Sequence, residues 1–214
     1  MNDIIQTITV YAIPVIFAIT LHEAAHGYVA KYFGDATAYL QGRVTLNPLK
    51  HIDPVGTILI PLVLALLPLG FIFGYAKPVP VTFANLRNPK RDMIWVALAG
   101  PLCNFVQALA WLLGGIAASA LGVTEPFAFD VVRAGVLVNC IVAAFNLIPV
   151  PPLDGGRIAM GLLPLKASLT YSRIEPYGFF VVLALVATGV LNVWMRPIMG
   201  GMQALLSLLI TPFV

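Results

Sequence analysis

The chain has 214 residues, of which 60% are hydrophobic and only 10% are charged, and its mean hydropathy is +0.94. A soluble domain carries roughly 25% charged residues, so this composition excludes a soluble globular domain, a disordered chain, a secreted disulfide scaffold and a nucleic-acid-binding protein. The 12 Lys and Arg residues against 9 Asp and Glu give a net charge of +3. In a membrane protein such charges set the orientation in the bilayer, so they indicate no polyanionic partner. The chain is therefore predicted to be an integral membrane protein.

Five apolar stretches are long enough to be membrane-spanning helices, each of which needs about 20 residues. In chain order they are residues 4–33, 93–121, 131–150, 177–195 and 198–214. The third ends at Pro149, Pro151 and Pro152, because proline cannot continue a helix. The fifth is short enough to lie in the membrane interface instead. With no internal repeat visible, residues 1–214 are predicted to form a single all-α polytopic domain.

The segment 54–75 is also long and apolar, but prolines and glycines interrupt it. If it crossed the bilayer, the basic residues would be divided almost evenly between the two sides. If it enters and returns on one side, all 12 basic residues except Arg133 and Arg196 share that side, as the positive-inside rule expects of the cytoplasmic side. We therefore predict a re-entrant hairpin at 54–75, five or six transmembrane helices, an outside N-terminus and mostly cytoplasmic loops.

Residues 36–48 connect the first span to this hairpin and contain the run ATAYLQGRVTLN. Tyr39, Val44 and Thr45 favour strands and Gly42 would separate them, which predicts a small membrane-associated β-hairpin. An ordered polar loop is the alternative for this stretch.

Three ionisable residues lie inside the first predicted span: His22, Glu23 and His26, in the order H-E-x-x-H. Ionisable groups within a span are costly and usually functional. Histidines four residues apart share one helix face, so two imidazole nitrogens can bind one tetrahedral Zn²⁺ while the glutamate serves as general base. Buried structural histidines or a proton relay are the alternatives. We predict a zinc site, since two of the 3 histidines in the chain fall in this pattern.

A catalytic zinc ion needs a third protein ligand, and the sequence has few candidates. His51 and Asp53 precede the predicted re-entrant hairpin, and Asp35 lies in a Gly-Asp turn after the first span. Asp154 follows the proline-rich end of the third span, where a Gly-Gly pair lets the backbone approach closely. Asp154 could instead be the N-cap of a new helix, which composition alone favours.

Three motifs occur in this order: HEAAH at residues 22–26, AGPLCN at 99–104 and NLIPVPPLDGG at 146–156. Together they resemble the site-2 protease family of intramembrane zinc metalloproteases, and the resemblance covers nearly the whole chain. HIDPVGTILIP and the later FGYAKPVPV are similar to the compact branch of the family, which has no PDZ or CBS domain. Cys103 departs from the family, in which a small residue is more usual at this position.

The resemblance implies the roles of individual residues. It implies one zinc ion per chain, held by His22, His26 and Asp154. It implies that Glu23 activates water and that Asn146 binds the substrate or stabilises the oxyanion. In family members a β-sheet after the zinc-binding helix pairs with the unwound substrate, and residues 36–47 are the matching stretch here.

The function that the resemblance implies is hydrolysis of peptide bonds within or near the transmembrane segments of other membrane proteins. The partners are then a transmembrane-protein substrate and the lipid bilayer, with no nucleic acid. The expected location is a prokaryotic plasma membrane, with the active site open to the cytoplasm. His51 is a further catalytic candidate, because the predicted hairpin could carry it to the water or the oxyanion.

Two other functions are possible from the same residues. A catalytically inactive zinc-binding scaffold would have no need of Glu23. A proton or ion transporter could use intramembrane His and Asp side chains, but it does not explain why H-E-x-x-H and a Gly-Gly-flanked aspartate occur together. The sequence leaves the substrate and the oligomeric state open.

Overall fold

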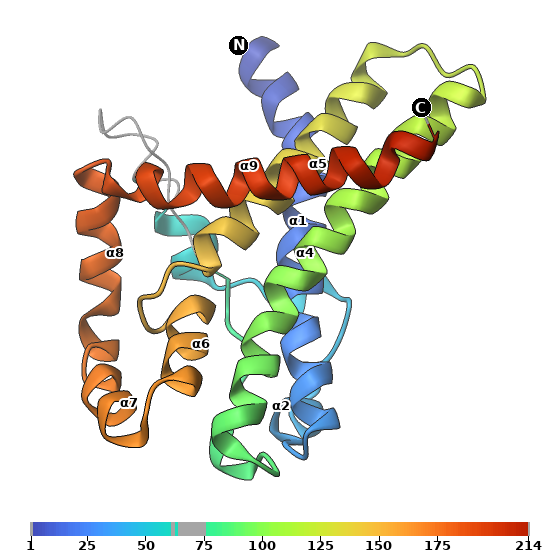
Figure 1. The fold of residues 1–214 in the computed structure, drawn as a ribbon. Helices are drawn as coiled ribbons and strands as arrows, with labels where there is room; N and C mark the ends of the chain where they lie inside the picture. Colours follow the sequence, from blue (N-terminus) through green and yellow to red (C-terminus); the bar gives the residue numbers. More distant parts are fainter. Residues whose placement is uncertain (1, 61–62, 64–75, 214) are drawn as a thin grey trace.

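The structure is a computed structural model of the chain and describes residues 2–60, 63 and 76–213 (Figure 1). Its long helices are α1 (Asn2–Tyr32), α4 (Pro89–Ala120), α5 (Pro126–Asn146) and α9 (Val190–Ile210). The shorter α-helices are α2 (Thr37–Leu40), α6 (Asp154–Leu162), α7 (Leu165–Ser172) and α8 (Gly178–Ala187). The 3₁₀ or π turns are η1 (Pro48–Lys50), η2 (Pro54–Leu59), η3 (Phe83–Asn85), η4 (Glu175–Tyr177) and η5 (Thr211–Phe213). Every regular element in the described residues is helical, which confirms the predicted all-α class.

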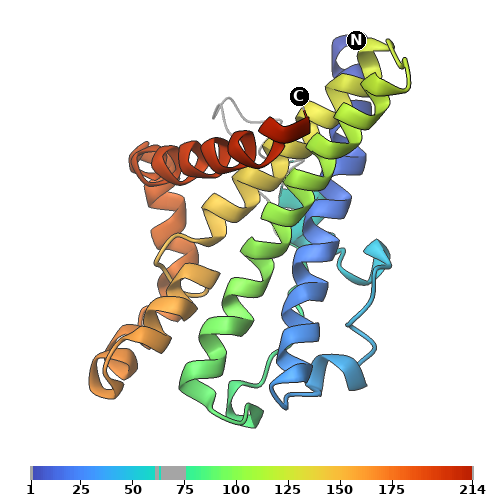
Figure 2. The ribbon, with the colours of Figure 1, turned by 45° about the vertical axis from the view of Figure 1, so that its right-hand side comes forward.

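Helices α1, α4 and α5 pack along one another and form the centre of the molecule, with α6 against α4 (Figures 1 and 2). Small buried residues line their contacts, as is usual where membrane helices approach closely. Examples are Ala18, Gly100, Ala108, Gly115 and Ala134. Many large apolar side chains are exposed on the outer surfaces of these helices, which is the arrangement expected for contact with lipid.

Within the described residues, five segments are long and apolar enough to cross a membrane: Ile5–Tyr32, Pro89–Ala120, Pro126–Asn146, Leu165–Ala187 and Val190–Phe213. The first three agree with the predicted spans. The last two differ in their bounds because the helix is interrupted inside 177–195 at Gly189, whose φ of 73° favours glycine. In both views α9 runs across α5 and α4 rather than along them.

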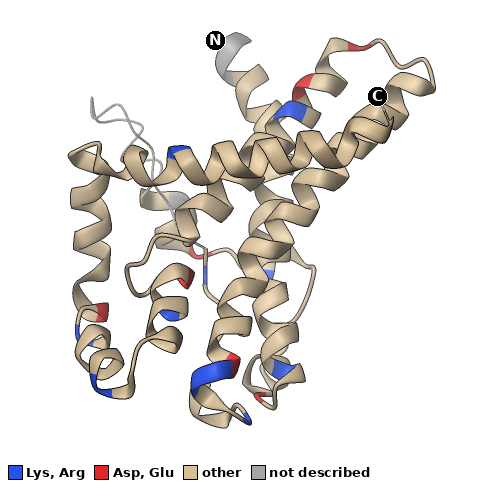
Figure 3. Cartoon of the chain, in the orientation of Figure 1, with Lys and Arg blue, Asp and Glu red and all other residues tan. Residues whose placement is uncertain are grey.

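The end of α1 and the start of α4 meet at one end of the bundle. Arg87 N donates to Phe33 O at 2.9 Å, so the chain between these residues leaves and returns at the same end. Most Lys and Arg residues gather toward this end (Figure 3). The predicted re-entrant hairpin is compatible with this arrangement, but 61–62 and 64–75 lie outside the described residues, so the hairpin stays a prediction.

The predicted β-hairpin at residues 36–48 is wrong. Thr37–Leu40 form the helical turn α2, and the described residues contain no strand. The fully buried Asp35 accounts for the turn, because its carboxylate accepts hydrogen bonds from Thr37 N at 3.0 Å and from Thr37 Oγ1 at 2.5 Å. Such local side-chain bonds to the backbone compete with strand formation.

Asp35 also joins this turn to the segment before α4. Its carboxylate accepts from Thr82 N at 2.7 Å and from Asn85 Nδ2 at 3.2 Å. Burial by itself would raise the pKa of Asp35, but the hydrogen bonds, led by that of the Thr37 hydroxyl, outweigh it and lower the pKa below its usual value. Asp35 is therefore an ionised side chain that holds the turn after α1 and the segment before α4 together.

Candidate metal centre

His22, His26 and Asp154 bring three ligand atoms together inside the bundle. The two histidines lie one turn apart on α1, with their Nε2 atoms 3.1 Å from each other. Asp154, the first residue of α6, places Oδ2 at 3.3 Å from His22 Nε2 and Oδ1 at 3.3 Å from His26 Nε2. In the part of the chain that the structure describes, these residues form the one group of metal-binding side chains close enough to share an ion.

The spacing of these atoms fits zinc. Ligand atoms about 2.0–2.1 Å from a tetrahedral zinc ion lie about 3.3–3.4 Å from one another. Here the two Nε2 atoms are 3.1 Å apart, and each lies 3.3 Å from a different oxygen of the Asp154 carboxylate. Asp154 Oδ2 is buried and has no hydrogen-bond partner among the described residues. Gly100 on α4 leaves space beside the ligands, since a Cβ there would lie 2.5 Å from His26 Nε2 and 2.6 Å from His22 Nε2.

Helix α4 determines which nitrogen of each histidine faces the centre. His26 Nδ1 lies 2.7 Å from Val96 O, and a carbonyl oxygen can only accept, so Nδ1 carries the proton. His22 Nδ1 lies 2.6 Å from Asn104 Oδ1. Both Nε2 lone pairs then face the Asp154 carboxylate and each other. These groups all offer electron pairs, so a cation bound between them would satisfy all three.

Asp154 reaches the histidines because the chain turns tightly between α5 and α6. A Cβ at Gly155 would lie 2.5 Å from Ile148 O, and one at Gly156 would lie 2.6 Å from Val150 C. Only glycine allows this approach, which confirms the predicted role of the Gly-Gly pair. Asp154 is the first helical residue rather than the N-cap, so the alternative of an N-cap does not hold.

Side chains from the C-terminal half hold this turn in place. Arg157 on α6 forms an ion pair with Glu175, and the Tyr171 hydroxyl on α7 donates to Pro149 O. The turn that carries Asp154 is therefore attached to α7 and η4.

Glu23 lies between the two histidines in sequence, and its carboxylate contacts the segment before η3. Glu23 Oε2 accepts a hydrogen bond from Val79 N at 2.7 Å. Val79 stands between Pro78 and Pro80, which have no N–H of their own. Its side chain lies against α1, since a Cβ added at Gly27 would be 3.2 Å from Val79 Cγ1. One backbone N–H therefore holds Oε2 and leaves Oε1 outside this hydrogen bond.

In the described residues, the hydrogen bonds of the Asn146 and His51 side chains go to backbone carbonyls and not to the three ligands. Asn146 donates from Nδ2 to Val142 O at 3.0 Å, in its own helix. His51 is buried, and its Nε2 donates to Thr45 O at 3.0 Å. Asp53, another candidate ligand, instead caps η2 with its carboxylate.

Sequence reasoning assigned no role to Gly100, Asn104 or Val79, although all three lie against the site. The AGPLCN motif contains the first two, and an asparagine within an apolar span is a usable signal of function. Val79 carries no such signal, because it contributes a backbone N–H and not a side chain.

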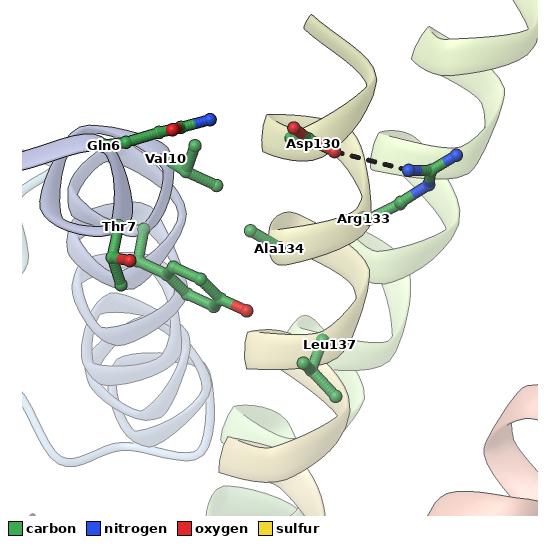
Figure 4. A pocket seen from close by; sticks show the side chains of 8 residues that line it. Gln6, Thr7, Val10, Asp130, Arg133, Ala134 and Leu137 are labelled. Carbon is green, nitrogen blue, oxygen red and sulfur yellow. Dashed lines mark hydrogen bonds and ion pairs between the residues drawn. The ribbon is translucent and has the colours of Figure 1, made fainter. Parts of the chain in front are cut away.

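A separate hollow of about 380 Å³ opens between α1 and α5 (Figure 4). Tyr11 lines it from α1, and Asp130 and Arg133, which form an ion pair at 3.3 Å, line it from α5. Tyr11 and His22 are about 16 Å apart along α1 at 1.5 Å per residue. The hollow is therefore not part of the metal centre.

Comparisons with known proteins identify the family. The family model described as "Peptidase family M50" matches residues 128–189. "Putative zinc metalloprotease YwhC" of Bacillus subtilis (strain 168) is 38% identical over 202 residues, which are 92% of this chain and 89% of that protein. "Putative zinc metalloprotease Rip2" of Mycolicibacterium smegmatis is 32% identical over 188 residues, 84% of this chain and 67% of that protein. No solved structure matches the chain.

The likeness to YwhC extends over nearly the whole chain, and the matched family segment includes Asp154. The donor set fits zinc, and the apolar helices are those of an integral membrane protein. The chain therefore belongs to peptidase family M50, the site-2 proteases, and is a zinc metalloprotease.

Proposed function

We propose that the protein hydrolyses peptide bonds within or near the transmembrane segments of other membrane proteins. In this proposal His22, His26 and Asp154 hold the zinc ion and Glu23 is the general base. The observation that carries it is the meeting of two histidine Nε2 atoms, 3.1 Å apart, with a carboxylate whose two oxygens each lie 3.3 Å from one of them, beside a glutamate on the same turn of an apolar helix. A hydrolytic centre among such helices favours substrates whose scissile bond lies at membrane depth.

Zinc bound by these ligands supplies a Lewis acid that polarises the scissile carbonyl and makes water easier to deprotonate. Glu23 accepts the proton from the attacking water and later returns it to the leaving amine. The hydrogen bond from Val79 N to Oε2 fixes the orientation of the carboxylate. Oε1 is then the oxygen that takes the proton.

Asn146 and His51 are proposed to act on the substrate. Asn146 Nδ2 would exchange its bond to Val142 O for the developing oxyanion. His51 Nδ1 is buried without a hydrogen-bond partner in the described part of the chain. Because Nε2 carries the ring proton, Nδ1 is an acceptor and is available to a water molecule or a substrate N–H. His51 also supports the base indirectly, because its carbonyl accepts from Lys77 N at 2.9 Å, two residues before Val79.

We propose that the centre opens to the cytoplasm. His22 and His26 lie in the half of α1 nearer to the end at which α1 and α4 meet. Most basic residues gather toward that end (Figure 3), and basic loops are retained in the cytoplasm. The plasma membrane of a prokaryote is the location that suits this orientation and the bacterial relatives.

The test is cleavage of a defined peptide by the zinc-loaded protein in liposomes. The substrate is a single-span peptide with a Gly-Pro pair in its span, and the matched control carries Leu-Leu there. A helix hides its carbonyls in hydrogen bonds, and Gly and Pro weaken a helix by about 1 and 3 kcal/mol relative to Ala. We expect cleavage within the span, about tenfold or more faster for the Gly-Pro peptide, with product masses locating the bond.

Two outcomes would contradict the proposal. Zinc binding without cleavage of either peptide would favour an inactive scaffold. If a soluble unfolded peptide added to the same assay were cleaved and neither span peptide were, membrane spans would be excluded as the substrate class.

Val79→Pro is expected to slow cleavage, because it removes the one N–H that holds Glu23 and keeps an apolar side chain of similar size. A hydrogen bond to a charged group contributes about 1.5–3 kcal/mol, so kcat for the Gly-Pro peptide should fall about tenfold to a hundredfold at unchanged zinc content. Val79→Ala keeps the N–H and should retain most of the wild-type kcat. Equal rates in the two variants would exclude this role for the Val79 N–H.

A further inference from the structure

Two asparagines lie fully buried in the bundle behind His22. Asn104 on α4 and Asn139 on α5 have no exposed surface, and the mechanism above uses neither. A polar amide that is buried without hydrogen bonds costs about 2–7 kcal/mol, so the partners of these two side chains determine what they do.

The partners fix the orientation of each amide. Asn139 Nδ2 donates to Gly135 O at 2.8 Å, which leaves Asn139 Oδ1 facing Asn104. Asn104 Nδ2 donates to that oxygen at 2.8 Å and to Ala18 O at 3.1 Å. Both N–H groups of Asn104 are then used, and its Oδ1 can only accept, from His22 Nδ1 at 2.6 Å.

We propose that Asn104 and Asn139 form a relay of two amides that positions His22 for zinc and fixes its tautomer. The relay starts at Gly135 O on α5, passes through α4 and ends at His22 Nδ1 on α1. A reversed Asn104 amide would present its NH₂ to Nδ1 and move the histidine proton to Nε2, the atom that faces Asp154. Asn139 prevents this reversal. Its Oδ1 can only accept a hydrogen bond, so it pairs with the NH₂ group of Asn104 and not with the Asn104 oxygen.

The backbone alone fixes the same tautomer in His26, with the proton on Nδ1, because this atom donates to Val96 O. His22 is therefore the ligand whose protonation depends on side chains and on the packing of α5 against α4. The inference rests on the proposed role of His22 as a zinc ligand. Buried asparagines also hold membrane helices together, and that structural role alone would change the stability of the protein but not its zinc affinity.

The test measures zinc affinity of the purified full-length protein in detergent by competition with a chelator. The melting temperature of the metal-free protein and the visible spectrum of the Co²⁺ form are recorded beside it. Asn104→Leu removes the acceptor at similar size, and loss of such a partner typically lowers metal affinity about 10–100-fold. We expect that fall and an altered Co²⁺ spectrum. Asn104→Asp keeps an oxygen facing Nδ1 and is expected to recover most of the affinity.

Gln107→Leu is the matched control, because Gln107 is buried on the same helix and lies outside the relay. It is expected to leave zinc affinity unchanged. Asn139→Leu is expected to weaken zinc binding less than Asn104→Leu, because Asn104 keeps its contact with His22. The double variant should bind no more weakly than Asn104→Leu alone, because Asn139 acts only through Asn104.

Wild-type zinc affinity in Asn104→Leu, or losses that add in the double variant, would overturn the relay. Should Asn104→Leu fail to fold, Asn139→Leu alone decides, and an unchanged affinity with a lower melting temperature would leave helix packing as its role. If the wild-type protein binds no zinc, the proposed function fails with the relay. Zinc bound equally by wild type and both variants overturns only the relay.

Discussion

Glu23→Gln is expected to slow cleavage of the Gly-Pro peptide about 10²–10⁴-fold, the usual range for the loss of a general acid–base group. The substitution removes the charge that accepts the proton but keeps an oxygen able to accept from Val79 N, which lies 2.7 Å from Glu23 Oε2. The fold and the three zinc ligands are then undisturbed, so zinc affinity should equal that of the wild type. Initial rates and bound zinc per chain, measured on one preparation, check both expectations.

His26→Ala is the comparison, because it removes a ligand and leaves the base. This variant is expected to lose both zinc and cleavage, so the pair separates metal binding from proton transfer. A Glu23→Gln protein that cleaves at the wild-type rate would show that another group is the base. Zinc binding in both the wild type and Glu23→Gln, with cleavage by neither, would favour a scaffold.

The proposed ligands were predictable because short stretches of sequence determine their local placement. The helical repeat puts His22 and His26 on one face, and their Nε2 atoms lie 3.1 Å apart. The prolines and the Gly-Gly pair predict a tight turn before Asp154, which the structure contains. That this turn meets α1 did not follow from spacing, and only the resemblance to the family implied it.

Local strand preference was a poor guide after α1. Tyr39, Val44 and Thr45 favour strands, but strand preference depends on neighbouring strands that can pair, and the described residues contain none. The buried Asp35 carboxylate instead starts a helical turn at Thr37. A single hydrogen-bonding side chain thus outweighed the preferences of several residues.

The surroundings of the ligands could not be predicted, since they depend on how α4 packs against α1. Val96 O and Asn104 Oδ1 reach their histidines across 70 and 82 residues of sequence. No local period encodes which face of α4 meets His22 and His26. The same packing places Gly100 against the ligands, and its importance is visible only when the helices are together.

Gly100→Ala is expected to remove most zinc binding, and cleavage with it. The added Cβ would lie 2.5 Å from His26 Nε2 and 2.6 Å from His22 Nε2, so either the rings turn away or α4 moves off α1. Overpacking typically costs about 1–3 kcal/mol. Here the strain falls on the ligand geometry, so zinc affinity should fall about tenfold to a hundredfold in a chelator competition.

Two other glycines of α4 provide controls for this substitution. A Cβ at Gly114 meets no atom within 4 Å, so Gly114→Ala changes only the helix itself. A Cβ at Gly115 would lie 2.9 Å from Val132 Cγ1, so Gly115→Ala crowds the contact between α4 and α5 away from the ligands. Both variants are expected to bind zinc like the wild type, with a lower melting temperature for Gly115→Ala. Equal zinc loss in Gly115→Ala would assign the effect to displacement of α4, whereas a loss confined to Gly100→Ala assigns it to the space between the ligands.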